Sequence, residues 1–217
     1  MKVGTDGVLL GAWASVEGLT RALDIGTGTG LIALMLAQRC PGEVDGVEIE
    51  PAAAAQAAEN VKNSPWASRV KIFSVPIQRF APETPQKYDA VVCNPPFFHD
   101  SYEAKDKERT LARHLVSLTH EELVKMAANL LTKKGRLSII IPYQVHERFG
   151  LLANRYNLYA QRLTKVYPTP LKRPHRILAE FGFSECKNPK TSSLVIEENG
   201  RHQYSPEYKK LTGEFYL

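Results

Sequence analysis

Four consecutive residues, Asn94-Pro95-Pro96-Phe97, carry groups that could hold a planar substrate with an NH2 group. They directly follow residues 88–93, an apolar segment typical of a buried strand. Two prolines remove backbone donors and keep the chain extended, so the carbonyls before them are free to accept. The asparagine oxygen and a proline carbonyl can then accept the NH2 hydrogens while the aromatic ring stacks on the substrate. By themselves, these residues would fit a proline-stiffened turn equally well.

A glycine-rich turn lies upstream, with the spacing G-x-G-x-G at Gly26, Gly28 and Gly30. Glycines there allow positive φ and let a ligand approach the backbone closely. A dinucleotide fingerprint would need a further glycine at position 31, where this chain has leucine. The turn and Asp24 just before it are therefore predicted to contact a different cofactor.

An acidic residue ends the second predicted strand, over residues 44–48. The Glu48 carboxylate can accept both ribose hydroxyls of a nucleoside, which makes it our candidate for that contact. Glu50 is a weaker candidate, because it is well placed to cap the alanine-rich helix predicted over residues 51–63. A glycine turn, an acidic second strand and Asn-Pro-Pro-Phe, in that order, form a stronger signal together than any one of them alone.

Composition limits the class of protein. A chain of 217 residues can bury the core of one α/β domain. It contains no apolar run long enough to span a membrane and no signal peptide ahead of the glycine turn. Three cysteines without C-x-x-C spacing favour a reducing cytoplasm. The six histidines lack metal-ligand spacing, so we expect no metal.

Charge is divided unevenly along the chain. Residues 1–100 carry 8 Lys+Arg and 11 Asp+Glu, whereas residues 101–217 carry 20 and 12. The second half is therefore strongly basic, and nucleic acid is the simplest anionic partner. Arg113 and Arg176 are the preferred candidates for contacting it, and Arg109, Lys172, Arg173 and His175 lie near them in sequence.

The predicted elements alternate between strand and helix, as in a mostly parallel, doubly wound sheet. Strands are expected over 21–25, 44–48, 70–73, 88–93 and 137–141, and three antiparallel strands over 159–167, 176–183 and 193–197. Helices are expected over 5–14, 29–39, 51–63, 119–131 and 144–156, with a Thr119/Glu122 capping box. The expected fold is a Rossmann-like α/β domain with seven strands and a C-terminal antiparallel hairpin.

The order of these motifs resembles class I S-adenosylmethionine-dependent methyltransferases. The segment Met1-Lys2-Val3-Gly4-Thr5-Asp6 and the following Gly7 to Trp13 narrow the resemblance to bacterial tRNA (adenine-N6)-methyltransferases, which modify valine tRNA beside the anticodon. The resemblance extends over nearly the whole chain, through Asn94-Pro95-Pro96-Phe97-Phe98 to Lys172-Arg173-Pro174-His175-Arg176. It implies S-adenosylmethionine as cofactor, adenine N6 in tRNA as acceptor, and substrate contacts at Phe97 and Phe98.

Further cofactor contacts follow from this resemblance. Thr5 and Asp6 are implied to lie beside the cofactor, although Asp6 could equally be only a helix cap, and Asn94 is implied to contact the cofactor as well as the substrate. Relatives often carry an acid after the third strand, where it holds the cofactor adenine. This chain has Val75-Pro76-Ile77-Gln78 instead, so the Ile77 backbone or Gln78 would have to replace it. We expect residues 1–217 to form one methyltransferase domain without a short N-terminal segment usual in that family, and a monomer by default.

Three alternative functions remain open from the residues. A glutamine amide has the same NH2 geometry as adenine, so methylation of release factors would suit the tetrapeptide. Adenine methylation of ribosomal RNA or DNA would suit it too. The third alternative is a non-catalytic RNA-binding module with the same fold. The basic second half of the chain favours RNA over glutamine.

Overall fold

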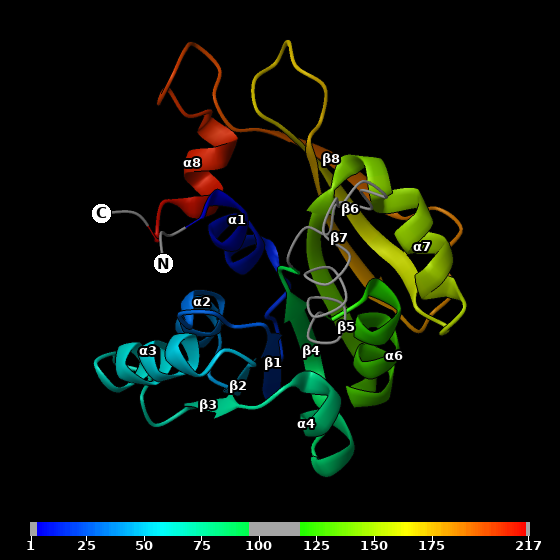
Figure 1. Ribbon diagram of the computed structural model, residues 1–217. Coiled ribbons are helices and arrows are strands. Elements are labelled where there is room, and N and C mark those ends of the chain that lie inside the picture. The colour runs from blue at the N-terminus through cyan, green and yellow to red at the C-terminus, as the bar shows by residue number, and fades with distance from the viewer. Residues whose placement is uncertain (1–3, 96–117, 216–217) are drawn as a thin grey trace, which may run out of the picture.

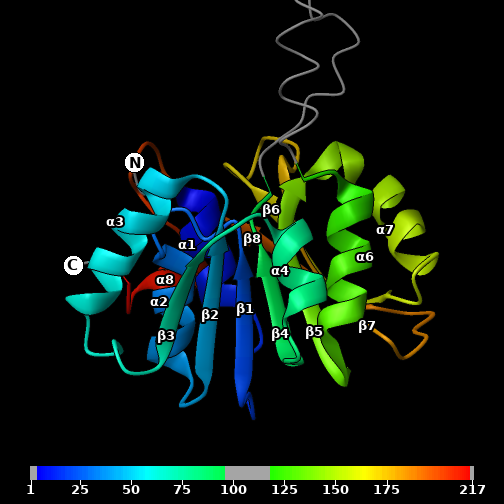
Figure 2. The same ribbon diagram turned by 60° about the horizontal axis from the view of Figure 1, so that its bottom comes forward.

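The computed structural model describes residues 4–95 and 118–215, whose strands form one mixed sheet with helices on both faces (Figures 1 and 2). The strands of these residues are β1 (Arg21–Ile25), β2 (Glu43–Glu48), β3 (Val70–Ser74), β4 (Tyr88–Cys93), β5 (Leu131–Pro142), β6 (Tyr159–Tyr167), β7 (Arg176–Gly182) and β8 (Lys190–Val195). Four predicted site residues, Pro96, Phe97, Phe98 and Arg113, lie outside the described part of the chain.

Strand order brings the two motifs together. The order across the sheet is β3-β2-β1-β4-β5-β7-β6-β8, and β1 pairs in parallel with both β2 and β4. From β1 the chain adds β2 and β3 on one side, and it then crosses back to add β4 and β5 on the other side. The strand order therefore switches at the boundary between β1 and β4. In open α/β sheets, such a switch point at the carboxyl ends of the strands is where ligands bind. Because Ile25 pairs with Cys93, the glycine turn and Asn94 leave the sheet side by side.

The C-terminal part of the sheet corrects the prediction in two ways. The described residues form eight strands, which match the eight predicted ranges but exceed by one the seven strands of the expected fold. The expected antiparallel hairpin is present as β6 and β7, but β8 pairs in parallel with β6. Only Leu194 of β8 is buried, since this strand lies at the edge of the sheet. An exposed edge strand carries little pattern that could reveal its direction from sequence.

The helices of the described residues cover the two faces of the sheet. They are α1 (Thr5–Trp13), α2 (Leu31–Arg39), α3 (Pro51–Lys62), α4 (Ile77–Glu83), α6 (His120–Leu130), α7 (His146–Asn154) and α8 (Pro206–Thr212), with a 3-10 turn, η1, over Tyr143–Val145. Figure 2 shows α1, α2, α3 and α8 on one side of the sheet and α4, α6 and α7 on the other. Each face of the sheet carries its own hydrophobic core, and successive residues of β4 point to opposite faces. Val91 and Cys93 belong to the core beneath α6, whereas Ala90 and Val92 belong to the core beneath α1 and α2.

Five of the seven α-helices among the described residues coincide with predicted ones. The Thr119/Glu122 capping box is confirmed at the start of α6, where the Thr119 hydroxyl accepts from the Glu122 N–H at 3.2 Å. Two helices were not predicted, α4 and α8. The start of α8 had a readable signal, because Ser205 accepts from the Tyr208 N–H at 3.0 Å and Pro206 occupies the first helical position. α4 is short and contains Pro82, which disguises it.

No helix among the described residues is long and apolar enough to cross a membrane. The three cysteines, Cys40, Cys93 and Cys186, are free thiols.

Candidate active site

The turn after β1 depends on backbone conformations that favour glycine. Gly26, Gly28 and Gly30 have φ values of 71°, 58° and 84°, all in the left-handed region. The turn is attached to the neighbouring strand because the N–H groups of Gly26 and Thr27 donate to the Val47 carbonyl at 2.9 and 3.1 Å. Gly30 then precedes the first residue of α2. The G-x-G-x-G spacing therefore specifies a rigid loop between β1 and the start of a helix.

Replacing Gly30 with alanine is expected to lower the free energy of unfolding by about 1–2 kcal/mol, the cost of a left-handed conformation with a side chain. The added Cβ would lie 3.4 Å from Ala57 Cβ, which is ordinary contact, so backbone strain is the main term. Denaturant titration measures the loss. Gly150→Ala is the matched control: this glycine lies inside α7, an added Cβ would meet no atom within 4 Å, and alanine should stabilise by about 0.5–1 kcal/mol. Equal effects of the two substitutions would contradict the strained-turn interpretation.

Asp24 is fully buried beneath this turn. Its Oδ2 accepts from the Thr27 hydroxyl at 2.6 Å and from the Ala33 N–H at 3.1 Å, so it connects β1, the turn and α2. Its Oδ1 is buried and has no hydrogen-bond partner among the described residues. Burial raises the pKa of Asp24 from 3.8 to about 7, and the Glu48 charge adds to this while the two hydrogen bonds oppose it. The contacts of Asp24 shape the turn, and direct contact with a cofactor stays a prediction.

Glu48 lies at the end of β2, beside the turn, and is 9% exposed. Its Oε2 accepts from the Gly28 N–H at 2.8 Å and its Oε1 accepts from the Glu50 N–H at 2.9 Å. A carboxylate oxygen has a second acceptor site, so both oxygens can still receive hydroxyl hydrogens. The alternative candidate, Glu50, caps α3 by accepting from the Ala52 N–H at 3.3 Å, which confirms its predicted capping role.

Asn94 follows β4 at the same edge of the sheet. Its Oδ1 is buried and accepts no hydrogen bond from the described residues. A buried amide oxygen without a donor is costly, so such groups usually have a functional reason. Pro95 is buried beside it. The preceding residue, Cys93, is also buried, and burial raises the pKa of its thiol well above the ordinary value. The negative charges of Asp24 and Glu48 add to this effect, so the thiol stays neutral.

The segment after β3 approaches the same edge, since Ser74 pairs with Glu48. Ile77 is 5% exposed and packs in the core. The Gln78 side chain bonds to Glu122: burial alone would raise the pKa of Glu122, but hydrogen bonds from Thr119 and Gln78 lower it overall. The Gln78 side chain is thus engaged with the start of α6. A cofactor contact from the backbone at Ile77 or Gln78 stays a prediction.

Two predicted residues from opposite ends of the chain contact each other. The Arg176 Nε donates to Asp6 Oδ2 at 2.9 Å, which joins the amino end of α1 to the start of β7. Asp6 does not cap the helix: Gly4 is the N-cap and no side-chain cap bond is present, so the capping alternative is wrong. Thr5 is exposed beside it. The sequence holds no signal for this ion pair, because its partners are separated by 170 positions.

A hollow of about 540 Å³ lies at the opposite, amino-terminal edge of the sheet, lined by Trp13, Arg39, Asp89 and Arg162 among others. It includes none of the residues predicted for methyl transfer. Within residues 4–95 and 118–215, no three His, Cys, Asp or Glu side chains gather as a metal site would require.

Comparison with known proteins agrees with the geometry. The family model described as methyltransferase small domain matches residues 8–159. A tRNA1(Val) (adenine(37)-N6)-methyltransferase of Bacteroides thetaiotaomicron is 49% identical over the whole chain and 91% of its own length. Proteins with the same name from Flavobacterium psychrophilum and Histophilus somni are 45% and 40% identical, again over the whole chain and over 93% and 91% of their own lengths.

Solved structures support the fold alone, because their identities are low. A predicted O-methyltransferase of Agrobacterium tumefaciens superposes with a TM-score of 0.74 at 19% identity, covering 96% of both chains. The N-methyltransferase NodS of Bradyrhizobium japonicum gives a TM-score of 0.54 at 16% identity, over 84% of this chain and 93% of its own. With relatives 40–49% identical over its full length, the chain belongs to the methyltransferase small domain family and, within it, to the tRNA1(Val) (adenine(37)-N6)-methyltransferases.

Proposed function

We propose that this chain transfers a methyl group from S-adenosylmethionine to the exocyclic N6 of an adenine in tRNA, at adenine 37 of a valine tRNA. The observation that carries the proposal is the buried Asn94 Oδ1, which has no donor among the described residues at the edge where the glycine turn ends. The names of the full-length relatives favour adenine in tRNA over the other NH2 acceptors.

The described residues at this edge fit a nucleoside-bearing cofactor. The turn contains three positive-φ glycines, and a Cβ added at Gly26 would meet no atom within 4 Å, so a ligand can approach the backbone there. The Glu48 carboxylate is fixed by two backbone donors and keeps acceptor capacity for ribose hydroxyls. We propose that Glu48, Gly26 and Gly28 hold the ribose and the methionine part, with Thr5, Asp6 and the Ile77–Gln78 backbone completing the site. When bound, S-adenosylmethionine supplies an electrophilic methyl group.

Asn94 prepares the acceptor nitrogen. The N6 lone pair of adenine is delocalised into the ring, so the amine is a poor nucleophile. Hydrogen bonds accepted by Asn94 Oδ1 and by the Pro95 carbonyl would hold both amine hydrogens out of the conjugated plane and free the lone pair. The nitrogen–methyl bond would form as the methyl–sulfur bond of the sulfonium breaks and leaves a neutral thioether, and one of the two hydrogens would then leave the nitrogen as a proton to water. Correct positioning of the two reactants can contribute roughly 7–11 kcal/mol, so the transfer itself requires no side chain with a tuned pKa.

The basic second half provides cations on the same edge. The turn between β6 and β7 is closed by the Lys172 N–H, which donates to the Thr169 carbonyl at 3.2 Å, and it leaves Lys172 and Arg173 exposed. We propose that these side chains contact phosphates of the tRNA. Each such contact should add about −0.9 (duplex) or −0.7 (single strand) to the salt slope of log K.

The substrate can be identified directly. The protein is incubated with labelled S-adenosylmethionine and, separately, total tRNA, DNA, ribosomal RNA or a release factor, and the products are digested. We expect the label in N6-methyladenosine from tRNA, and its loss when adenine 37 of a valine tRNA transcript is replaced by guanine. Label on a release-factor glutamine, or on DNA or ribosomal RNA but not tRNA, would overturn the substrate assignment.

A further inference from the structure

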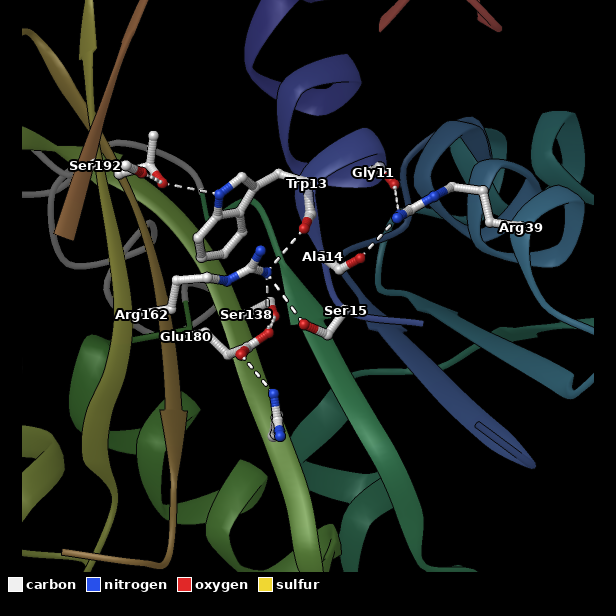
Figure 3. A network of polar contacts seen from close by, with 11 residues as sticks. Gly11, Trp13, Ala14, Ser15, Arg39, Ser138, Arg162, Glu180 and Ser192 are labelled. Atoms are coloured by element: carbon white, nitrogen blue, oxygen red, sulfur yellow. Dashed lines mark hydrogen bonds and ion pairs between the residues drawn. The ribbon is translucent and has the colours of Figure 1, made fainter. Parts of the chain in front are cut away.

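Helix α1 is held in place by three arginines that come from three other elements. Arg39 of α2 and Arg162 of β6 contact its carboxyl end, and Arg176 of β7 contacts its amino end. Figure 3 shows the carboxyl-end contacts, with the Arg162 guanidinium lying against the indole ring of Trp13. The helix itself is short, nine residues, and depends on its surroundings for stability.

The carboxyl end of α1 is anchored through its last carbonyls. Arg39 Nη1 donates to the Gly11 and Ala14 carbonyls at 2.7 and 2.8 Å, and Arg162 Nη2 donates to the Trp13 carbonyl at 2.9 Å. These carbonyls have no partner within a helix, and cations there also complement the helix dipole. Arg162 is itself fixed by the buried Glu180 at 3.2 Å. This end of α1 is therefore rigidly placed against the sheet.

The amino end of α1 is joined to β7 by an ion pair. Gly4 supplies no side-chain cap, so the usual N-terminal stabilisation is absent. Asp6 instead accepts from Arg176 at 2.9 Å, and both side chains are only about one-fifth exposed. Arg176 pairs with Pro142 at the carboxyl end of β5, which places the ion pair on the same edge of the sheet as Asn94.

We infer that Arg176 is a positioning residue for cofactor binding: it fixes Asp6, and through it the start of α1, at the carboxyl edge of the sheet. This revises its expected role as an RNA contact, because its guanidinium is engaged within the protein. The inference rests on the proposed function for the cofactor contacts of Thr5 and Asp6. The new element is that Arg176, 170 positions from Asp6, fixes the position of these contacts. Cofactor affinity therefore depends on a residue at the start of β7.

The test measures cofactor binding without RNA, by calorimetric titration of S-adenosylmethionine into wild type, Arg176→Ala, Arg176→Lys and Asp6→Asn. We expect Arg176→Ala and Asp6→Asn each to raise the Kd about tenfold, a usual size for coupling between two sites. The double variant should lose no more affinity than Asp6→Asn alone, since Arg176 acts only through Asp6. Arg176→Lys should restore part of the affinity, because a lysine can still pair with the carboxylate. The Km for tRNA should change less than the cofactor Kd.

Arg155→Ala is the matched control, since Arg155 forms an exposed ion pair with Glu121 at 3.5 Å, and it should leave the cofactor Kd unchanged. Additive effects of Arg176→Ala and Asp6→Asn, or a raised tRNA Km with an unchanged cofactor Kd, would overturn the inference and return Arg176 to RNA binding. If Arg176→Ala fails to fold, the comparison of Arg176→Lys, Asp6→Asn and their double variant decides in the same way. These binding measurements use no methyl acceptor, so they test only the role of Arg176. A failure of the proposed function would instead appear in the labelling experiment, as label on another acceptor.

Discussion

Replacing Asn94 with alanine is expected to lower the rate of methyl transfer about 10²–10³-fold, the usual effect of losing one preorganised hydrogen-bonding group in an active site. Alanine removes the buried Oδ1 that has no other partner among the described residues, so little stability should be lost with it. The adenine amine would then keep its lone pair delocalised in the ring. Single-turnover transfer of labelled methyl to tRNA, at saturating cofactor, measures the effect on the chemical step.

The control for this substitution is Asn63→Ala, at an exposed asparagine that follows α3. It should leave the transfer rate at the wild-type level. Thermal unfolding of both variants separates a lost catalytic group from a lost fold. If Asn94→Ala transferred methyl groups at the wild-type rate, Asn94 would have no catalytic role and the proposed mechanism would be wrong.

The second large effect concerns the pH dependence of stability at Asp24. Burial raises its folded-state pKa from 3.8 to about 7, so the folded protein holds a proton that the unfolded chain has already released. Between these two values the free energy of unfolding therefore falls as the pH rises. One pKa unit is worth about 1.4 kcal/mol, so Asp24 should account for a loss of up to about 4 kcal/mol between pH 4 and pH 7.

Asp24→Asn is expected to remove this contribution. The asparagine oxygen can replace Oδ2 as acceptor for the Thr27 hydroxyl and the Ala33 N–H, and the side chain carries no charge at any pH. Denaturant titrations at several pH values should show the variant gaining stability relative to wild type as the pH rises toward 8. If the difference in free energy of unfolding between wild type and variant stayed constant from pH 4 to pH 8, Asp24 would not be titrating in this range.

Asp89→Asn should have the opposite pH dependence, because the pKa of Asp89 is lowered in the folded protein whereas that of Asp24 is raised. Asp89 lies at the start of β4 and, although burial alone would raise its pKa, hydrogen bonds from Thr20 and from the Arg21 and Thr20 N–H groups lower it overall. Its stabilising effect is present at neutral pH and is lost as the pH falls through its lowered pKa. The asparagine variant should therefore be less stable than wild type at pH 7, and the difference should shrink in acid.

Much of the fold was predictable because its signals are local. Positive φ at Gly26, Gly28 and Gly30 is a property of the turn itself, and glycine is the residue that allows it. The Thr119/Glu122 box and the apolar run of β4 are likewise recognised from a few consecutive residues. The direction of β8 was wrong because an exposed edge strand has the same pattern in either direction. The start of α8, a capping serine followed by proline, is a local signal of the same kind.

The candidate site likewise has features that the sequence predicts and features that depend on the tertiary structure. The sequence by itself determined its components: a glycine turn, an acid at the end of β2 and an asparagine at the end of β4, each placed by the strand that precedes it. Only the tertiary structure decided how they act on one another. The register of β1 with β2 and β4 brings Gly26, Glu48 and Asn94 to one edge, and burial gives Asp24 its raised pKa. The Asp6–Arg176 pair also belongs to this class, because charge pairing and desolvation depend on distances that a sequence pattern does not contain.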